Sequence, residues 1–358
     1  MGMPAVSVAM VVRNMDRFVG EAMESILNQS FRDFEFVIVD FGSTDHSRPI
    51  ISGLQAKDSR IKLHLIPPCS LPEARNASVF LAQGKYIALM DADDVAFPHR
   101  LERQVAYLNQ HPDIALLGGA IQCTGPNGTP RFLRSFPLTD GEIRAALARG
   151  TALHQTTVMM RREVPGVVKG YRKAFALAED YDLWLRVIEH FQVANLPEPL
   201  VYYRIHSGQV SVQKLRQEMM CWMAARAAAQ IRAEGRADPL WEVAEITPDV
   251  LTLLGVTPAA FAQALAIAYF DWMNAMWQAS NDDAVLQLID ELLELSRSDR
   301  VDSVILSEAC LRAARVHYRR GAFLASIGST ARAIRIRPVV LGRPIKKLLP
   351  HAFPKPTA

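Results

Sequence analysis

Cysteine is scarce in this chain of 358 residues, and its four cysteines follow no regular spacing. They are Cys69, Cys123, Cys221 and Cys310, with no Cys-x-x-Cys element among them. A disulfide framework or a structural zinc site needs cysteines or histidines at short, recurring intervals, so both are disfavoured. Scattered free thiols are typical of a reducing compartment, and we expect a cytoplasmic location.

Long apolar runs are also absent, because no uninterrupted run reaches the length of a membrane-spanning helix. The first apolar segment, residues 4–12, has no basic leader, so it predicts a buried strand and not a signal peptide. No G-x-G-x-x-G follows this strand, and no P-loop sequence occurs in the chain. These absences disfavour a Rossmann dehydrogenase and a P-loop enzyme.

Acidic residues are absent after Glu308, whereas eleven lysines and arginines follow it. Because the whole chain carries a formal charge of +3, the first 308 residues carry −8. The small total disfavours nucleic-acid binding. The asymmetry is typical of a solvated helix face or of a surface that meets anionic lipid. We therefore expect that the basic tail can dock on the inner face of the cytoplasmic membrane, at roughly 1 kcal/mol per well-placed basic residue.

Strand and helix patterns alternate over about the first two hundred residues. Four apolar segments separated by helical patterns predict strands at residues 7–12, 34–39, 61–66 and 85–90. Alternation of this kind predicts an α/β fold with a mostly parallel sheet flanked by helices. Beyond Gly208 the pattern is helical throughout. We expect an α/β domain over residues 1–212 and an α-helical C-terminal region over residues 213–358.

The last two predicted helices, residues 301–320 and 322–336, meet at Gly321. Small residues follow the spacing of a tetratricopeptide-type hairpin at Ala314, Ser326 and Ala333. One hairpin is not a solenoid, because stacked repeats are needed to bury the helix faces. We interpret it as a helical appendage packed on the main domain, and a role in binding is left open.

Three aspartates within four residues, Asp91, Asp93 and Asp94, follow the fourth predicted strand. Carboxylates this close repel one another and lose hydration, unless water, hydrogen bonds or a cation offsets the cost. Ligands bind α/β sheets outside the carboxyl ends of the strands, where a divalent cation carrying a phosphorylated ligand is a natural partner. Judged from these four residues alone, a solvated turn between a strand and a helix is the alternative to a cation site. A second acidic cluster, at residues 179–182, favours a functional site.

Five further segments accompany this cluster in a fixed order: Val11-Val12-Arg13-Asn14, Asp40-Phe41-Gly42-Ser43, Ala74-Arg75-Asn76, Glu179-Asp180-Tyr181-Asp182 and Tyr202-Tyr203-Arg204-Ile205-His206. With them, residues 5–210 resemble a family 2 glycosyltransferase of the GT-A fold. Several motifs in one order are far more specific than any single motif.

The resemblance implies inverting transfer of a sugar from a nucleotide-diphosphate donor to an acceptor hydroxyl, in the assembly of a cell-surface polysaccharide or glycoconjugate. The acceptor could be a lipid-linked glycan, a free glycan or a protein. Processive members carry a Gln-x-x-Arg-Trp element, which is absent here, so we expect a single transfer.

The resemblance also implies roles for individual residues. Asp91, Ala92 and Asp93 form the D-x-D element, with Asp93 as a direct metal ligand and Asp91 facing the donor's ribose or sugar. His206 resembles a histidine that supplies a further metal contact. Oxygen and imidazole ligands together suit Mn²⁺, and Mg²⁺ is also compatible. A nucleoside diphosphate leaves poorly unless its charge is neutralised as it departs.

Asp180 matches the family's catalytic base, which takes the proton of the acceptor hydroxyl as the anomeric carbon is attacked. His154, Glu179 and Trp184 fall on the acceptor side, although a structural histidine and a core tryptophan are plainer interpretations. An acidic helix start, favoured by the helix dipole, is the alternative for the whole stretch. Arg75 matches an arginine that contacts a phosphate or orients the first aspartate of the D-x-D element.

Two departures from the family pattern fall where the nucleotide base binds. The family has Pro-x-Tyr-Asn after the first strand, and here Val11 and Arg13 replace the proline and the tyrosine. The family also has two aspartates before Gly-Ser. Here Asp40 is followed by Phe41, which cannot accept a hydrogen bond from a pyrimidine ring. Arg13 could stack on the base or reach a phosphate. We expect an altered nucleotide preference, or donor affinity that depends mainly on the diphosphate and sugar.

Two other functions stay open on the sequence. Residues 91–95 also satisfy the Asp-x-Asp-x-(Thr/Val) pattern of haloacid-dehalogenase-like phosphotransferases, in which Asp91 would be the nucleophile. That motif normally opens its domain, and here 90 residues precede it. The other function is a non-catalytic scaffold that binds through its helical region and retains a degenerate sugar-nucleotide cleft.

Overall fold

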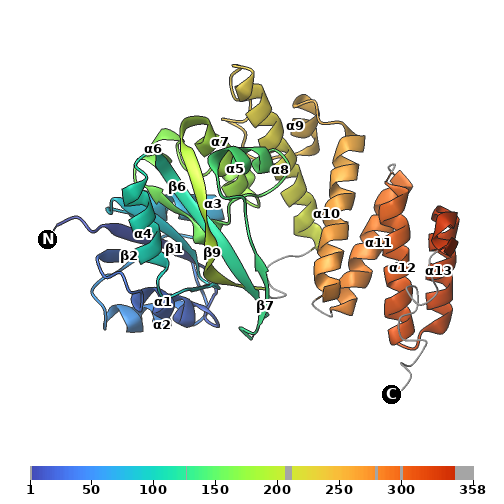
Figure 1. Ribbon diagram of the computed structural model, residues 1–358, viewed down its shortest axis with the longest axis horizontal. Coiled ribbons are helices and arrows are strands. Elements are labelled where there is room, and N and C mark those ends of the chain that lie inside the picture. The colour runs from blue at the N-terminus through green and yellow to red at the C-terminus, as the bar shows by residue number, and fades with distance from the viewer. Residues whose placement is uncertain (1, 126, 206–211, 279–280, 299–300, 343–358) are drawn as a thin grey trace. The chain divides into compact units, whose positions relative to one another are not determined.

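The computed structural model describes residues 2–125, 127–205, 212–278, 281–298 and 301–342. The chain divides into two compact units (Figure 1). One comprises residues 1–209 with 225–246, and the other comprises residues 210–224 with those from 247 onward. Helix α8 (Val212–Ala233) therefore contributes to both units. The expected division between residues 212 and 213 falls at the start of this helix and stays a prediction.

The α/β unit contains, among the described residues, one nine-stranded sheet. Its strands follow the order β3 (Ile61–Leu65), β2 (Phe34–Asp40), β1 (Val6–Val12), β4 (Tyr86–Asp91), β8 (Met159–Arg161), β6 (Ile114–Thr124), β9 (Gln192–Arg204) and β5 (Val95–Ala96), and β7 (Pro130–Arg134) pairs with β6. The first four strands of this order are parallel, as the alternating pattern predicts. Beyond β4 the sheet is mixed, because β8 runs antiparallel to both β4 and β6, whereas β6 and β9 are parallel.

Helices flank this sheet (Figure 1). In chain order they are α1 (Val19–Leu27), α2 (Ser47–Gln55), α3 (Leu71–Leu81), α4 (Arg100–Gln110), α5 (Asp140–Leu147), α6 (Val164–Val167), α7 (Glu179–His190) and the shared α8. A capping box of Ser70 and Glu73 starts α3, so the first turn of this helix is fixed. Arg75 follows within the next turn and is thereby held in place.

The core of the α/β unit joins the sheet to its helices. Alternate residues of β1 point to one face and pack with the inner face of α1, as expected for strand and helix periodicities. These fully buried residues are Val6, Val8, Met10, Val12, Val19, Met23 and Ile26. The strands are therefore rigid supports for the loops at their carboxyl ends.

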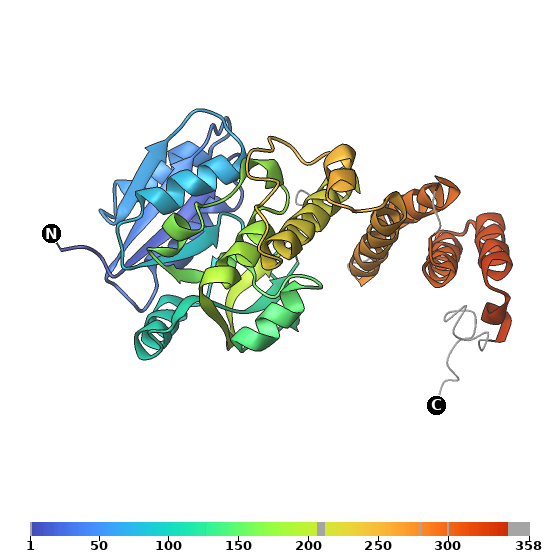
Figure 2. The same cartoon turned by 90° about the horizontal axis from the view of Figure 1, so that it is seen from above.

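The second unit is helical. Its helices are α9 (Pro248–Leu253), α10 (Pro258–Gln278), α11 (Asp282–Ser298), α12 (Ser303–Arg319) and α13 (Phe323–Ile336), followed by the short helix η3 (Pro338–Gly342). From α10 to α13 each helix packs against the next (Figure 2). The α12–α13 hairpin is closed by Gly321 at a φ of +74°, and Ser326 Oγ donates to the Ala314 carbonyl at 2.9 Å. Among the described helices, none has the length and hydropathy of a transmembrane segment.

Candidate active site

The carboxyl ends of β1, β2 and β4 lie side by side. The strand register pairs Val12 with Asp40 and Val11 with Asp91. Parallel strands end at one edge of a sheet, and the loops that follow them surround a common space where ligands bind. The structure therefore brings together the segments that follow the first, second and fourth predicted strands.

The turn after β4 concentrates negative charge. Asp91 and Asp93 are partly exposed, whereas Ala92 between them is buried at 4% exposure, so only its backbone can face a ligand. Asp94 is fully buried. Its Oδ1 accepts a hydrogen bond from the Arg204 amide at 3.1 Å, whereas its Oδ2 has no hydrogen-bond partner. Burial, and then the charges of Asp93 and Asp91, raise the pKa of Asp94 well above its usual value.

Arg75 of α3 lies between two carboxylates from distant parts of the chain. Its Nη2 is 3.2 Å from Oδ1 of Asp91, and its Nε is 3.1 Å from Oε1 of Glu179. The second contact is an ion pair without an aligned hydrogen bond. Burial would lower the pKa of Arg75, but the charges of Asp91 and Glu179 outweigh it and raise the pKa above its usual range. One buried cation therefore joins the end of β4 to the start of α7.

Asp182, also in the first turn of α7, has a structural environment. It is fully buried and accepts hydrogen bonds from Arg172 Nε at 3.0 Å and from Arg186 Nη2 at 2.7 Å. Arg172 also pairs with Asp238, at 2.9 Å. Those two bonds reach Oδ2, and Arg172 Nη2 donates to Oδ1, so arginines occupy both carboxylate oxygens of Asp182 and the side chain anchors α7.

Asp180 differs from its acidic neighbours because its carboxylate is partly exposed. Its Oδ1 accepts the Tyr181 amide at 2.7 Å, and within the described part of the chain it forms no ion pair. Burial raises the pKa of Asp180, and the charge of Arg75 opposes that effect. Burial also raises the pKa of Asp91, where the charges of Asp93 and Asp180 add to it against that of Arg75. Asp91 and Asp180 are therefore close enough for their charges to interact.

The carboxylate of Asp40 forms hydrogen bonds within the turn that follows β2. It is fully buried, and its Oδ1 accepts the amides of Gly42 and Ser43 at 3.0 and 2.8 Å, while its Oδ2 accepts Arg48 Nε at 3.1 Å. Burial raises the pKa of Asp40, but these hydrogen bonds outweigh it and keep the pKa below its usual value. The carboxylate that stands where the family binds a base is already fully engaged.

The two departures from the family pattern contact each other. Phe41 is 8% exposed, and the guanidinium carbon of Arg13 lies 5.8 Å from the centre of its ring. A cation over an aromatic face is attracted by the ring quadrupole. Arg13 therefore already has an aromatic partner in the protein. Val11, on the neighbouring strand end, lines a small hollow together with Arg75 and Asp91.

The residues expected on the acceptor side fall into different places. His154 is partly buried and lies between the rings of Phe136 and Tyr203, at centroid distances of 6.1 and 4.7 Å. Burial lowers the pKa of His154 to about 3, so its imidazole is neutral, and its Nδ1 has no hydrogen-bond partner. Trp184 is fully buried in the core and offers no surface to an acceptor, unlike the expectation. His206 lies outside the described residues.

The carboxylates suit a hard divalent cation. Such ions are commonly held by one or two carboxylates together with phosphate oxygens of the ligand. Asp91 and Asp93 would supply oxygens, and beside them the buried Oδ2 of Asp94 has no hydrogen-bond partner. No three His, Cys, Asp or Glu side chains of the described residues form a complete metal cage. The residues therefore fit an ion whose coordination is completed by its ligand.

Sequence reasoning missed Arg204. Its Nε donates to the Asp93 carbonyl at 3.1 Å and its Nη2 pairs with Glu21 at 2.7 Å, so it fastens the end of β9 to the aspartate turn. The available signal was an arginine that closes an apolar strand, since a mostly buried charge needs a partner. Asp94 was quoted with its cluster, but its burial depends on Arg204 and is a tertiary effect.

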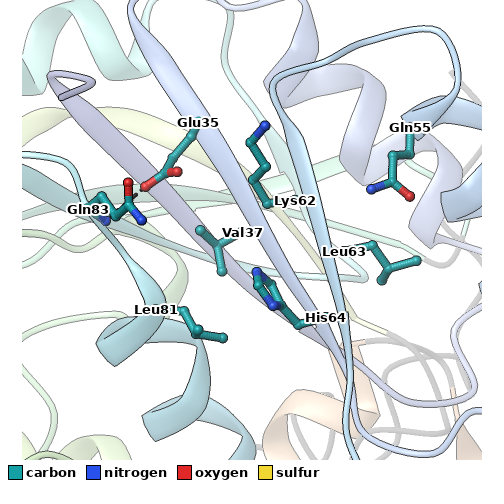
Figure 3. Close-up of a pocket in the computed structure, with 8 residues that line it drawn as sticks. All are labelled: Glu35, Val37, Gln55, Lys62, Leu63, His64, Leu81 and Gln83. Carbon is teal, nitrogen blue, oxygen red and sulfur yellow. Dashed lines mark hydrogen bonds between the residues drawn. The ribbon is translucent and has the colours of Figure 1, made fainter. Parts of the chain in front are cut away.

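A second hollow, of about 310 Å³, lies beside β2 and β3 (Figure 3). None of the predicted site residues lines it. Its carboxylate, Glu35, already accepts hydrogen bonds from Ser7 Oγ and from the Gln83 amide at 2.8 Å, and Lys62 Nζ donates to the Ser59 carbonyl. Its two charged side chains thus have partners within the protein, and we assign the hollow no role.

Comparison with known proteins identifies the family. Residues 7–165 match the family described as glycosyl transferase family 2. The O-antigen biosynthesis glycosyltransferase WbnJ of Escherichia coli is 32% identical over 207 residues, which cover 56% of this chain and 80% of that protein. The chain belongs to glycosyl transferase family 2. This membership confirms the predicted enzyme class, a glycosyltransferase, over a phosphotransferase with Asp91 as nucleophile.

Solved structures show the same fold. Residues 1–349 of S. aureus TarS, in complex with UDP-GlcNAc, align with a TM-score of 0.54 and 17% identity over 94% of this chain and 91% of that one. The mannosyltransferase PcManGT of Pyrobaculum calidifontis, in complex with GDP-Man and Mn²⁺, aligns with a TM-score of 0.51 and 15% identity, covering 92% and 88% of the two chains. The predicted GT-A fold is confirmed.

Proposed function

We propose that this glycosyltransferase moves a single sugar, with inversion, from a nucleotide-diphosphate donor to an acceptor hydroxyl during assembly of a cell-surface polysaccharide or glycoconjugate. The observation that carries this proposal is the double ion pair of Arg75, which brings Asp91 and the Glu179-Asp180 pair into one site. The printed names of similar proteins support it, because one acts in O-antigen biosynthesis and two hold sugar nucleotides.

On the donor side, Asp93 would hold a divalent cation, Mn²⁺ or Mg²⁺, with His206 as a further ligand. When bound, such an ion neutralises the charge that develops on the departing diphosphate. The Mn²⁺ in PcManGT supports this assignment. Asp91 faces the ribose or sugar of the donor. Arg75 fixes the orientation of Asp91 and keeps a positive charge next to the site.

On the acceptor side, Asp180 takes the proton of the incoming hydroxyl. A carboxylate whose pKa is raised by burial is a better base than a solvated one. Attack from the face opposite the diphosphate inverts the anomeric centre. Glu179 acts indirectly, since its carboxylate holds Arg75, and neutral His154 packs near the aspartate turn without supplying charge.

The nucleotide base is bound differently from the family pattern. Asp40 is occupied by its turn and by Arg48, and Phe41 is covered by Arg13. The family's hydrogen bond to a pyrimidine ring therefore has no free acceptor at these two positions. Donor affinity then depends mainly on the diphosphate and the sugar.

The cellular site proposed for this reaction is the cytoplasm, at the inner face of the cytoplasmic membrane. Lipid-linked acceptors lie there, and basic residues are attracted to an anionic leaflet. The support is the excess of positive charge after Glu308.

A panel of sugar nucleotides, assayed for hydrolysis and transfer with Mn²⁺, tests the proposal. We expect at least one donor to be cleaved by the wild type, and Asp93→Ala to abolish cleavage. Asp113→Ala is the matched control, because Asp113 is an exposed aspartate outside the site. If no nucleotide binds in the presence of Mn²⁺, the chain is a scaffold with a degenerate cleft.

A further inference from the structure

Helix α13 exposes an unusual amount of apolar surface. Phe323, Leu324 and Ile327 leave 59%, 87% and 66% of their surfaces exposed. Leu324 is the most exposed large apolar side chain among the described residues. Val339, just beyond the helix, is 66% exposed as well. Single exposed apolar residues need no explanation, but a contiguous group marks an interaction surface.

These side chains form one stripe along the helix. At about 100° per residue, a stripe roughly 100° wide contains Phe323, Leu324, Ile327, Ala331 and Ile334. The opposite side carries Ser326 and Ala333, both buried within the helical unit. Figures 1 and 2 show α13 as the last helix of its row, next to α12. Phe323 at the start of the stripe contacts Tyr318 of α12, with ring centroids 5.6 Å apart, whereas Leu324 and Ile327 lie away from the face that packs in the hairpin.

Positive charge borders the stripe. Arg335 follows Leu324 around the helix, Arg332 comes next, and both are exposed. No acidic residue occurs in the 50 residues after Glu308, and Asp290 of α11 lines a hollow together with Arg332. The earlier arginines Arg319 and Arg320 are already paired with aspartates of α11. A helix with an apolar stripe beside arginines is typical of a segment that lies in the interface of an anionic membrane.

We propose that α13 binds an anionic lipid surface, with the stripe inserted at the boundary between headgroups and acyl chains and with Arg332 and Arg335 at the lipid phosphates. A second copy of the chain is a poorer occupant, because pairing two α13 helices would bring their arginines together. Lipid satisfies both the apolar and the charged parts of the surface. This binding rests on the membrane location proposed above and narrows it to one helix, but it does not depend on sugar transfer, so the two can be tested separately.

Flotation of the full-length protein with vesicles tests the apolar part. We expect binding to phosphatidylcholine vesicles that contain phosphatidylglycerol, and little binding to phosphatidylcholine alone. Leu324→Ser combined with Ile327→Ser should lower the partition coefficient at least about tenfold, since each change removes a buried apolar side chain from the lipid. Leu253→Ser is the matched control, because Leu253 is 79% exposed in the same unit. Exposed positions are substituted, so an unchanged melting curve is expected for all three proteins.

The same assay tests the charged part. Arg332→Gln with Arg335→Gln should lower the partition coefficient about thirtyfold, as two well-placed charges contribute. Lys57→Gln with Arg103→Gln removes two exposed charges from the α/β unit and should change binding little.

Three results would overturn lipid binding by α13. The first is equal flotation with neutral and anionic vesicles. The second is stripe variants that bind as well as the wild type, which would assign any binding to other residues of the tail. The third is a dimer, seen by light scattering, that the Leu324→Ser and Ile327→Ser variant dissociates, which would make the stripe a protein interface.

Discussion

Asp182→Asn removes the charge from a buried carboxylate that two arginines share. Arg172 and Arg186 donate to its oxygens and are themselves only 7% and 5% exposed. Breaking a buried pair costs about 3–5 kcal/mol, because the remaining charges stay buried without their partner. Arg172 keeps its ion pair with Asp238, at 2.9 Å. We therefore expect the lower end, a loss of about 3 kcal/mol in the free energy of unfolding.

Thermal unfolding of the full chain, followed by circular dichroism, measures this loss. For a unit of this size 1 kcal/mol lowers Tm by about 2–4 °C, so Asp182→Asn should unfold roughly 6–12 °C below the wild type. Asp180→Asn is the matched control, because it is the same substitution two residues earlier in the same helix. It removes a charge that burial opposes, so it should melt at or above the wild-type temperature and still lose transfer.

The penalty should also depend on pH. Burial raises the pKa of Asp182, but the charges of Arg186 and Arg172 outweigh it and lower the pKa in the folded protein. The unfolded chain binds the proton more tightly, with a pKa near 3.9. The stabilisation is thus fully present above about pH 4 and lost as the pH falls through the folded value. The Tm difference should be constant from neutral pH to about pH 4 and shrink below. Equal melting of the wild type and Asp182→Asn at neutral pH would refute this reasoning.

Four further outcomes test the site. Glu179→Gln should slow transfer about tenfold by loosening Arg75, and an unchanged rate would show that one carboxylate suffices. Arg75→Lys keeps the charge but cannot bridge both acids, so calorimetry should give a Kd for the donor at least about tenfold higher; a wild-type Kd would exclude the bridging role. Chelation by EDTA should stop donor hydrolysis and Mn²⁺ should restore it, whereas hydrolysis that persists would contradict the metal assignment. Nucleoside diphosphates with different bases should bind within about tenfold of one another; much tighter binding of UDP that Asp40→Asn removes would contradict the altered base pocket.

The local sequence pattern was sufficient to predict the parallel half of the sheet and to identify the motifs. Each of its strands carries apolar residues and is followed by a helix pattern, and the D-x-D element begins at Asp91, the last residue of β4. The strands of the mixed half could not be predicted from the local pattern. Strand β8, Met159–Arg161, has only three residues, which is too short for a period of two to appear.

Tertiary partners account for what the sequence could not predict in the site. Nothing in the spacing of residues 179–182 says which acid meets Arg75, which meets two other arginines and which stays accessible. The pairing of Arg13 with Phe41 likewise joins residues on two different strand ends. Each of these two substitutions could be seen in the sequence, but the contact between them could be found only in the folded structure.

The central claim is that a cation at the end of β4 holds the donor diphosphate beside Asp180. Anomalous diffraction from crystals grown with Mn²⁺ and the accepted sugar nucleotide locates that ion directly. We expect an anomalous peak within coordination distance of Asp93 and of the diphosphate, with the anomeric carbon facing Asp180. A peak elsewhere in the protein, or a diphosphate bound away from Asp180, would contradict it.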